Sequence, residues 1–324
     1  MRPGKQLTTL RPDLAGGIRA FDTMANEGGF IAHQVFPVTE VAKQSGTFPK
    51  IDLKESLQSP ETRRGSRAEY NEIGWKFTDD NYATQDHGLQ HFIDDRDAEI
   101  YSEYFDAEVE GAELVVSNIL LAEELRAATT LFNPTTFSGK TAGVTNEWDD
   151  FSAATPITDV DNAVETIYDN SGVWANALVI SHKVFRNLSR CDEILEAIAS
   201  SGAGDSILPG KITAAQLAQA FRLDRVIVGG GTKNTANQGQ TAVPGQIWSG
   251  EYALVCRVVT EPGKFKQPGI GRTFHWDADG SQVGGTIESW RVAGQRGGWV
   301  RARHEVQQKL MLLELGYLLS NITT

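Results

Sequence analysis

Cysteine is scarce in this sequence, since Cys191 and Cys256 are the only two among 324 residues. Two cysteines are too few for a disulfide scaffold, so we expect both to be buried as small apolar side chains. Long apolar runs are missing as well, and no stretch approaches the roughly 20 apolar residues of a membrane-spanning helix. The N-terminal residues lack the apolar core of a signal peptide. We therefore expect a protein that is made in the cytoplasm and has no membrane partner.

Basic residues are in deficit: 30 Lys and Arg stand against 42 Asp and Glu, which gives a formal net charge of −12. An acidic surface repels phosphates, and this excludes general nucleic-acid binding across the whole surface. The apolar fraction of 40% and the charged fraction of 22% are ordinary for a globular protein. The chain therefore has enough apolar material for a folded core.

Motifs that carry chemistry are also lacking. His87 and His91 have the spacing of metal ligands, but no Cys or Glu completes a set around them. The segment Asp277-Ala-Asp-Gly resembles the start of a calcium loop, but its glycine comes two positions too early. Gly229-Gly-Gly follows a predicted strand without the Lys-Ser/Thr of a phosphate loop, so we interpret it as a flexible loop. The acid pairs, Glu123-Glu124 among them, fit caps, turns and solvated faces. We expect no enzyme activity, no metal and no cofactor.

One long helix is the strongest positive signal. Asp106 is a good N-cap, because its carboxylate can accept from the free amides of the first turn. Asn133-Pro134 ends the helix, since proline offers no amide and disfavours helix in the residue before it. We predict a helix over residues 106–132, roughly 40 Å long at about 1.5 Å per residue. Its middle is apolar nearly all round, so it must be covered on more than one side. We call it the spine helix.

A polar, turn-rich segment over residues 59–70 lies between two strand-like flanks, at residues 51–57 and 73–77. This pattern predicts a long hairpin with a polar tip that carries Arg63, Arg64 and Arg67. Such a tip has little apolar material, so it must pack on the rest of the chain or on a neighbouring subunit. We expect the three arginines to pair with carboxylates of an adjacent subunit, and a solvated tip is the alternative.

The N-terminal segment is basic and short of apolar residues. Its bases are Arg2, Lys5, Arg11 and Arg19, against Asp13 as the one acid in residues 1–20. Such a segment cannot fold by itself and needs a partner. Its larger apolar residues are Leu7, Leu10, Leu14 and Ile18. Because these give the arm something to bury, we expect it to clasp a neighbouring subunit; an acidic scaffold and nucleic acid are the alternatives.

The remaining segments are less distinctive. Val35, Phe36, Val38 and Val41 suggest a strand interrupted at Pro37, and a short helix opens at Phe92 with Asp94 or Asp95 as its cap. Further on, helices are predicted over 158–170, 182–200 and 213–221, and buried strands over 177–181 and 225–229. The pattern from residue 272 to 306 is β, and residues 307–322 are apolar enough for a buried closing strand or strand pair.

The order of these parts resembles the major capsid proteins of tailed phages, which share the Hong Kong 97-like fold. The resemblance rests on residues 31–46, the acidic start and Asn118-Ile-Leu-Leu of the spine helix, 176–188, 212–229, Ile247-Trp, and 314–321. It implies an α+β fold with an N-terminal arm, an extended β-hairpin loop, a peripheral domain that holds the spine helix, and an α/β axial domain. The implied bounds are 1–35 for the arm, 36–56 for the first part of the peripheral domain, 57–89 for the extended loop, 90–156 for the peripheral domain with the spine helix, 157–295 for the axial domain and 296–324 for the return to the peripheral domain.

The resemblance also implies a structural function. The chain would assemble in the host cytoplasm into pentamers and hexamers of an icosahedral shell, the virion capsid, with double-stranded DNA bound non-specifically on the inner face. A separate scaffolding protein, a portal and a decoration protein are the other implied partners. The tip has no lysine between Glu55 and Trp75, so the covalent cross-link of some relatives is not expected. An encapsulin-like compartment and, in a different class, a soluble α+β enzyme are the alternatives.

Overall fold

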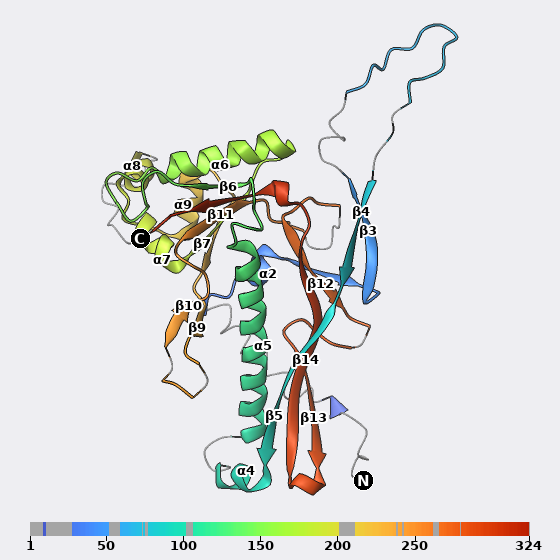
Figure 1. The fold of residues 1–324 in the computed structure, drawn as a ribbon, viewed down its shortest axis with the longest axis vertical. Coiled ribbons are helices and arrows are strands. Elements are labelled where there is room, and N and C mark those ends of the chain that lie inside the picture. Colours follow the sequence, from blue (N-terminus) through green and yellow to red (C-terminus); the bar gives the residue numbers. More distant parts are fainter. Residues whose placement is uncertain are drawn as a thin grey trace.

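The computed structural model describes residues 9–10, 28–51, 59–72, 74, 77–101, 106–200, 211–237, 239–241, 243–261, 266–278 and 280–323. A long sheet and a shorter α/β lobe lie at the two ends of one long helix, and a hairpin projects away from both (Figure 1). Both cysteines are buried and free, as predicted. No helix in these residues is long and apolar enough to span a membrane.

The spine helix is α5, Ala107–Leu131. Asp106 caps it as predicted, because its Oδ1 accepts from the backbone N of Glu108 at 2.9 Å. Buried side chains lie on several sides of the helix, among them Val115, Leu120 and Ala128. The helix therefore has cover on more than one face, as its apolar middle required.

The long sheet is built around β14, Gly297–Leu310. Along β14, residues 297–303 pair with β13, Thr286–Val292, and residues 297–306 pair with β5, Gln85–Asp94. The end of β14 pairs with β12, Gly271–Trp276, and β12 pairs in parallel with β2, Val38–Val41. The two-residue strand β1, Thr9–Leu10, adds to the edge at β13. The short helices α4, Asp95–Tyr101, and η1, Ala293–Gln295, lie at the ends of β5 and β13.

The α/β lobe contains a second sheet of five strands, in the order β6-β15-β11-β7-β8. These strands are Thr141–Gly143, Gly316–Ser320, Tyr252–Cys256, Ala177–Ser181 and Arg225–Gly229. One face is covered by α6, Pro156–Ser171, α7, His182–Leu188, α8, Asp192–Ser200, and α9, Ala214–Ala220. The other face packs on the C-terminal half of α5 and on α2, Ala32–Val35. A small two-stranded ladder lies below the lobe in Figure 1 and consists of β9, Thr232–Asn234, and β10, Pro244–Gln246. The short helix η2, Leu313–Leu315, precedes β15.

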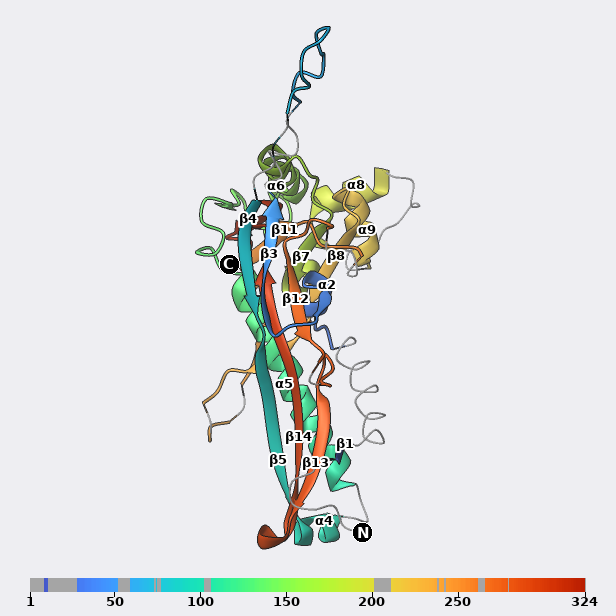
Figure 2. The same ribbon diagram turned by 90° about the vertical axis from the view of Figure 1, so that its right-hand side faces the viewer.

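The hairpin consists of β3, Ser45–Ile51, and β4, Phe77–Ala83, in antiparallel register from Ser45–Ala83 to Ile51–Phe77. Its tip, residues 59–72, extends far beyond the body in both ribbon views (Figures 1 and 2). The observed ladder lies closer to the body than the predicted flanks. Residues 85–89, which the sequence placed in the loop, belong to β5 of the long sheet.

Two local predictions are wrong, and a third is right except for its start. Residues 32–35 form helix α2 rather than a strand, because the distant Glu124 carboxylate caps it at the amides of Ile31 and Ala32. The short helix predicted from Phe92 is α4, and Asp94 caps it by accepting from the Arg96 amide at 2.8 Å, but it begins only at Asp95 because β5 keeps pairing with β14 up to Asp94. The helix predicted over 182–200 is broken between α7 and α8, where the Asp192 amide donates to Phe151 instead.

The three consecutive glycines serve close packing. A Cβ on Gly229 would lie 2.4 Å from the Trp248 ring, and one on Gly231 would lie 2.9 Å from Phe30. Backbone from residues 28–30 also approaches here, and the Gly230 amide donates to the Gly29 carbonyl at 3.0 Å. These glycines therefore let the N-terminal segment cross the end of β8, which the interpretation as a flexible loop missed.

Candidate assembly surfaces

The base of the hairpin is fixed to the long sheet by stacked rings. Tyr82 lies parallel to the ring of Phe274 with 4.8 Å between centroids, and Phe48 lies 5.8 Å from the same ring. On the neighbouring strand, Lys309 Nζ contacts Asp80 Oδ1 at 2.5 Å and lies over the Phe48 ring. Burial alone would raise the pKa of Asp80, but the Lys309 ammonium holds that pKa below its ordinary value. These contacts therefore fix the orientation of the hairpin relative to the long sheet.

Polar side chains add to this anchor at the turn into β5. Glu305 Oε1 accepts from Gln44 Nε2 at 2.6 Å and from Thr84 Oγ1 at 3.1 Å. The amide of Ala83 donates to Gln307 Oε1 at 2.8 Å. Both Thr84 and Glu305 are buried. Because these bonds link β3 and β4 to β14, bending the hairpin at its base would break several buried contacts at once.

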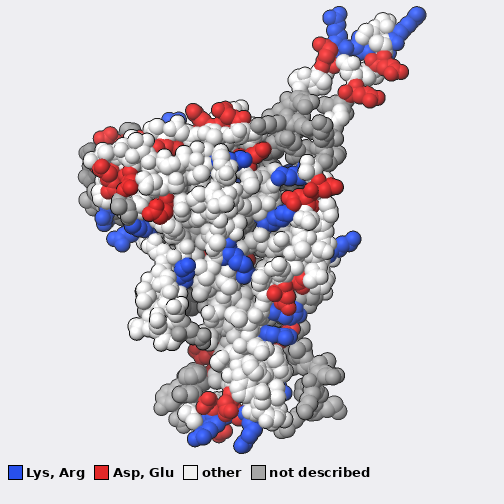
Figure 3. All heavy atoms as spheres, viewed as in Figure 1, with Lys and Arg blue, Asp and Glu red and all other residues white. Residues whose placement is uncertain are grey.

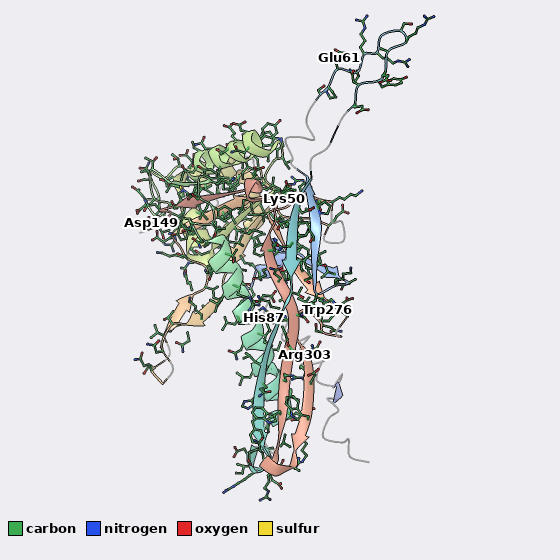
Figure 4. All side chains as sticks on the ribbon, turned by 45° about the vertical axis from the view of Figure 1, so that its right-hand side comes forward. Lys50, Glu61, His87, Asp149, Trp276 and Arg303 are labelled. Carbon is green, nitrogen blue, oxygen red and sulfur yellow. The ribbon has the colours of Figure 1, made fainter. Side chains whose placement is uncertain are left out.

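The tip contains all three predicted arginines, and all are exposed. The Arg64 guanidinium donates to the Ala68 carbonyl at 2.6 Å and lies 4.5 Å from the centre of the Tyr70 ring. Tyr70 is 73% exposed, which is unusual for a large aromatic side chain. Figure 4 shows the side chains around Glu61 spreading outward at the far end of the hairpin. The structure thus groups the arginines on one projecting surface. Their pairing with carboxylates of another subunit stays a prediction.

Most of the N-terminal arm lies outside the described residues. This applies to Arg2, Lys5, Leu7, Arg11, Leu14 and Arg19. The backbone of Thr9 and Leu10 forms β1, which pairs with Ser289 and Glu288 of the same chain. Sequence reasoning missed this pairing, because a two-residue strand has no periodic signal. Whether the arm also clasps a neighbouring subunit stays a prediction.

A buried polar junction joins the spine helix to both sheets. We use this term for His33, Glu123, Glu124, Arg126 and His304. Glu124 is 1% exposed, and its carboxylate accepts from the amides of Ile31 at 2.8 Å and Ala32 at 2.7 Å. It also accepts from Trp248 Nε1 at 2.6 Å. Burial raises the pKa of Glu124 in spite of these three donors.

The other half of the polar junction has fewer hydrogen bonds. Glu123 is 1% exposed, and among the described residues no donor bonds its carboxylate oxygens; His33 Nε2 lies 3.4 Å from Oε2. Burial would raise the pKa of Glu123, but His33, His304 and Arg126 hold that pKa below its ordinary value. His304 is fully buried, neither of its ring nitrogens has a hydrogen-bond partner in the described part of the chain, and burial lowers its pKa to about 4. The prediction that Glu123 and Glu124 lie on a solvated face is therefore wrong.

The two histidines that the sequence offered as metal ligands, His87 and His91, both lie on β5. His87 packs edge-on against His304 with 5.9 Å between ring centroids, and burial lowers the pKa of His87. Figure 4 shows His87 beside the spine helix. His91, four residues further along β5, is exposed and lies against the same helix at Gly111. Among the described residues, no group of three or more His, Cys, Asp or Glu side chains could hold a metal ion.

Two phage proteins are similar to this chain over most of its length. One is the major capsid protein of Pseudomonas phage JBD67, which is 26% identical over 300 residues, 91% of this chain and 92% of the relative. The other is the major capsid protein of Burkholderia phage BcepMu, 23% identical over 299 residues, 90% of this chain and 91% of the relative. No family model matches the chain.

Solved structures share the fold. A phage-related protein from Bordetella bronchiseptica RB50 aligns with a TM-score of 0.68 at 17% identity, over 98% of this chain and 99% of its own. The capsid protein of cyanophage P-SCSP1u aligns with a TM-score of 0.57 at 9% identity, over 88% of this chain and 86% of its own. The chain thus has the Hong Kong 97-like capsid fold and is similar, over nine tenths of its length, to phage major capsid proteins, as its sequence predicted.

Proposed function

We propose that this protein is the major capsid protein of a tailed double-stranded DNA phage and that it forms pentamers and hexamers of an icosahedral shell. The observation that carries the proposal is the hairpin. Its base is held to β12 and β14 by stacked rings and by polar bonds, of which the one between Thr84 and Glu305 is buried. Among the described residues, the hydrogen bonds and ring contacts of the tip stay within residues 59–72, and the tip projects well clear of the body (Figure 1). A firmly anchored projection with no packing of its own needs a second molecule to cover it.

In this proposal the arginines of the tip bind carboxylates of an adjacent subunit. Guanidinium groups suit bidentate contact with carboxylates, and they keep their charge when partly buried. The Arg64–Tyr70 stack offers a flat, amphipathic surface beside Arg63 and Arg67. Such a surface is more stable in contact with another protein surface than in contact with water.

The remaining parts take the positions that the resemblance implies. The arm, residues 1–35, clasps a neighbouring subunit. Residues 57–84 act as the extended loop, and residues 85–89 join the peripheral domain as part of β5. Within residues 157–295 the lobe acts as the axial domain around the symmetry axes, while β12 and β13 belong to the long sheet. The peripheral domain comprises residues 36–56 and 90–156 and the return at 296–324. Packaged DNA lies against the inner face without sequence preference, and a scaffolding protein, a portal and a decoration protein are partners during assembly in the host cytoplasm.

Size-exclusion chromatography with light scattering tests self-assembly. We expect pentamers, hexamers or shells over some range of protein concentration and ionic strength. A protein that stays monomeric under all conditions would contradict the proposal.

An encapsulin-like compartment is the second candidate, because the encapsulin of Synechococcus elongatus PCC 7942 shares the fold with a TM-score of 0.53 at 14% identity. The two functions differ in what the shell contains. Shells isolated from a natural source should hold double-stranded DNA under the first proposal and a protein cargo under the second. Absorbance spectra and mass spectrometry of the contents distinguish them.

A further inference from the structure

A row of carboxylates lies along the outward side of α6. Asp161, Glu165 and Asp169 follow one another at intervals of four residues, so they stand about 6 Å apart on one side of the helix at about 1.5 Å per residue. The opposite side of α6 buries Val160 and Ile167 against the sheet of the lobe. We call the three carboxylates the acidic row.

A matching row of bases lies on α7 and the turn that follows it. Lys183, Arg186 and Arg190 are spaced by three and four residues, and all three are exposed. Together with His182, Asn187 and Gln246 they line a cavity of about 220 Å³ that contains no acidic side chain. We call the three bases the basic row. On a chain whose net charge is −12, this concentration of positive charge needs an explanation.

Within the described residues, the acidic row and the two arginines of the basic row are not neutralised by salt bridges. In the part of the chain that the structure describes, no salt bridge reaches the three carboxylates of the acidic row, nor the guanidinium groups of Arg186 and Arg190. The two rows also lie far apart in the lobe. Helix α6 packs over β15 and β11, whereas α7 lies beside β7 and β8 toward the other edge of the sheet. Figure 3 shows red spheres along the upper edge of the lobe and blue spheres at its lower edge.

We propose that the acidic row of one subunit binds the basic row of a second copy of this chain. Two different faces on opposite edges of one lobe make a head-to-tail contact, and such contacts build a ring when the rotation between neighbouring copies closes. The inference rests on the proposed function, since it names the contact by which neighbouring lobes meet. Glu165 and Asp169 are four residues apart, as are Arg186 and Arg190, so each of the two arginines has a carboxylate to pair with.

An exposed aromatic pair supports the same contact. Tyr168 and Trp174, at the C-terminal end of α6, stack with 4.1 Å between ring centroids and remain 41% and 54% exposed. Exposed aromatic rings supply apolar area at an interface, and guanidinium groups such as those of the basic row stack on their faces. The pair lies directly beside Asp169, so charge and apolar surface occur on one docking face.

Nucleic acid is the competing occupant of the basic row, because phosphates also bind clustered bases. The second copy is favoured for two reasons. The overall charge of −12 repels a polyanion, whereas it does not prevent contact between two local rows of opposite sign. The acidic row also lacks any partner among the described residues, and only docking between copies satisfies both rows together.

Charge reversal on each side, followed by the combined swap, tests the contact. Arg186→Glu with Arg190→Glu, and separately Glu165→Arg with Asp169→Arg, should each raise the protein concentration needed for assembly on the order of tenfold. The variant that carries all four changes restores opposite charges across the contact and should assemble nearly as the wild type does. Reversal of two exposed carboxylates away from both rows, Glu196→Arg with Glu40→Arg, is the matched control. Circular dichroism checks that each variant is folded.

Each remaining outcome contradicts the proposal. If both double variants assemble like the wild type, or if the combined swap is as impaired as they are, the rows do not meet. If the Arg186/Arg190 variant assembles normally but loses binding to a double-stranded DNA fragment, the basic row is a nucleic-acid site. A wild-type protein that never assembles overturns the proposed function as well, which separates that failure from failure of this one contact.

Discussion

The spine helix is held in two different ways along its length. In its N-terminal half, Val116 and Ile119 pack among apolar side chains of β13 and β14. About one turn later, Glu123 and Glu124 are buried and depend on charges and donors from α2, β14 and the residues before β11. Apolar packing tolerates small shifts and is insensitive to pH, whereas buried polar groups lose free energy as soon as a partner moves or titrates. The apolar half therefore supplies stability, and the polar junction fixes where α2 and the lobe sit on the helix.

The largest expected effect comes from removing the Glu124 carboxylate. Glu124→Leu leaves the buried donors of Ile31, Ala32 and Trp248 without an acceptor, so we expect unfolding free energy to fall by about 4 kcal/mol. Urea unfolding followed by tryptophan fluorescence measures this. Glu124→Gln keeps one acceptor oxygen, so its unfolding free energy should fall by less than that of Glu124→Leu. A leucine variant as stable as the wild type would show that the junction does not hold α2.

The next effect comes from the apolar half. Ile119→Ala opens a cavity between the helix and the long sheet and should cost about 3 kcal/mol at any pH. Leu114, on the same helix but 53% exposed, is the matched control, and Leu114→Ala should stay within about 0.5 kcal/mol of wild type. Equal losses from both variants would mean that this half of the helix is not held by packing.

Acid should weaken the junction through His304. Its pKa is lowered to about 4 by burial, so between pH 6.5 and 4 the unfolded chain binds more protons than the folded one. The contribution of neutral, buried His304 to the unfolding free energy is fully present above pH 6.5. It is lost as the pH falls to about 4, which lowers the unfolding free energy by on the order of 3 kcal/mol. Burial and Arg126 lower the pKa of His87 too, which acts in the same direction, whereas the raised pKa of Glu124 acts in the opposite one.

His304→Leu removes this contribution without breaking a hydrogen bond, because neither ring nitrogen has a partner among the described residues. It also removes one of the groups that hold the Glu123 pKa down, which acts in the same direction. Denaturant unfolding of wild type and variant at several pH values is the measurement. We expect a shallower loss of stability toward pH 4 in the variant. Parallel pH profiles would show that other groups cause the acid sensitivity.

The smallest effect on stability belongs to the hairpin tip. Reversal of Arg63, Arg64 and Arg67 to Glu should leave the unfolding free energy within about 0.5 kcal/mol of wild type, because all three are exposed. Assembly should nevertheless fail, since the reversed charges would repel the carboxylates of the neighbour. The triple Lys variant keeps the charge and serves as the control. Normal shells from the Glu variant would mean that the tip is merely solvated.

Local signals predicted the parts of the fold that depend on neighbours in sequence. The spine helix has its cap, its acidic first turn and its terminating Asn133-Pro134 within one stretch, and its observed bounds differ from the prediction by one residue at each end. Strand β7 is buried on both faces, as its unbroken apolar run indicated. The order of such parts was also enough to indicate the Hong Kong 97-like fold.

Contacts between distant segments could not be predicted in the same way. Helix α2 depends on Glu124, more than 90 residues away, and β1 depends on an edge strand near the other end of the chain. The polar junction looks like ordinary surface charge in the sequence, because only the packed helix shows that Glu123 and Glu124 both face inward. The acidic and basic rows were visible as residue spacings, yet only the fold shows that they lie on opposite edges of one lobe.

Negative-stain electron microscopy of the purified protein tests the central claim most directly. If the anchored hairpin and the arm join subunits as proposed, fields at increasing protein concentration should show rings of five or six subunits or closed shells of uniform diameter. Particles the size of a single 35.4 kDa chain under every condition of concentration and salt would contradict the account.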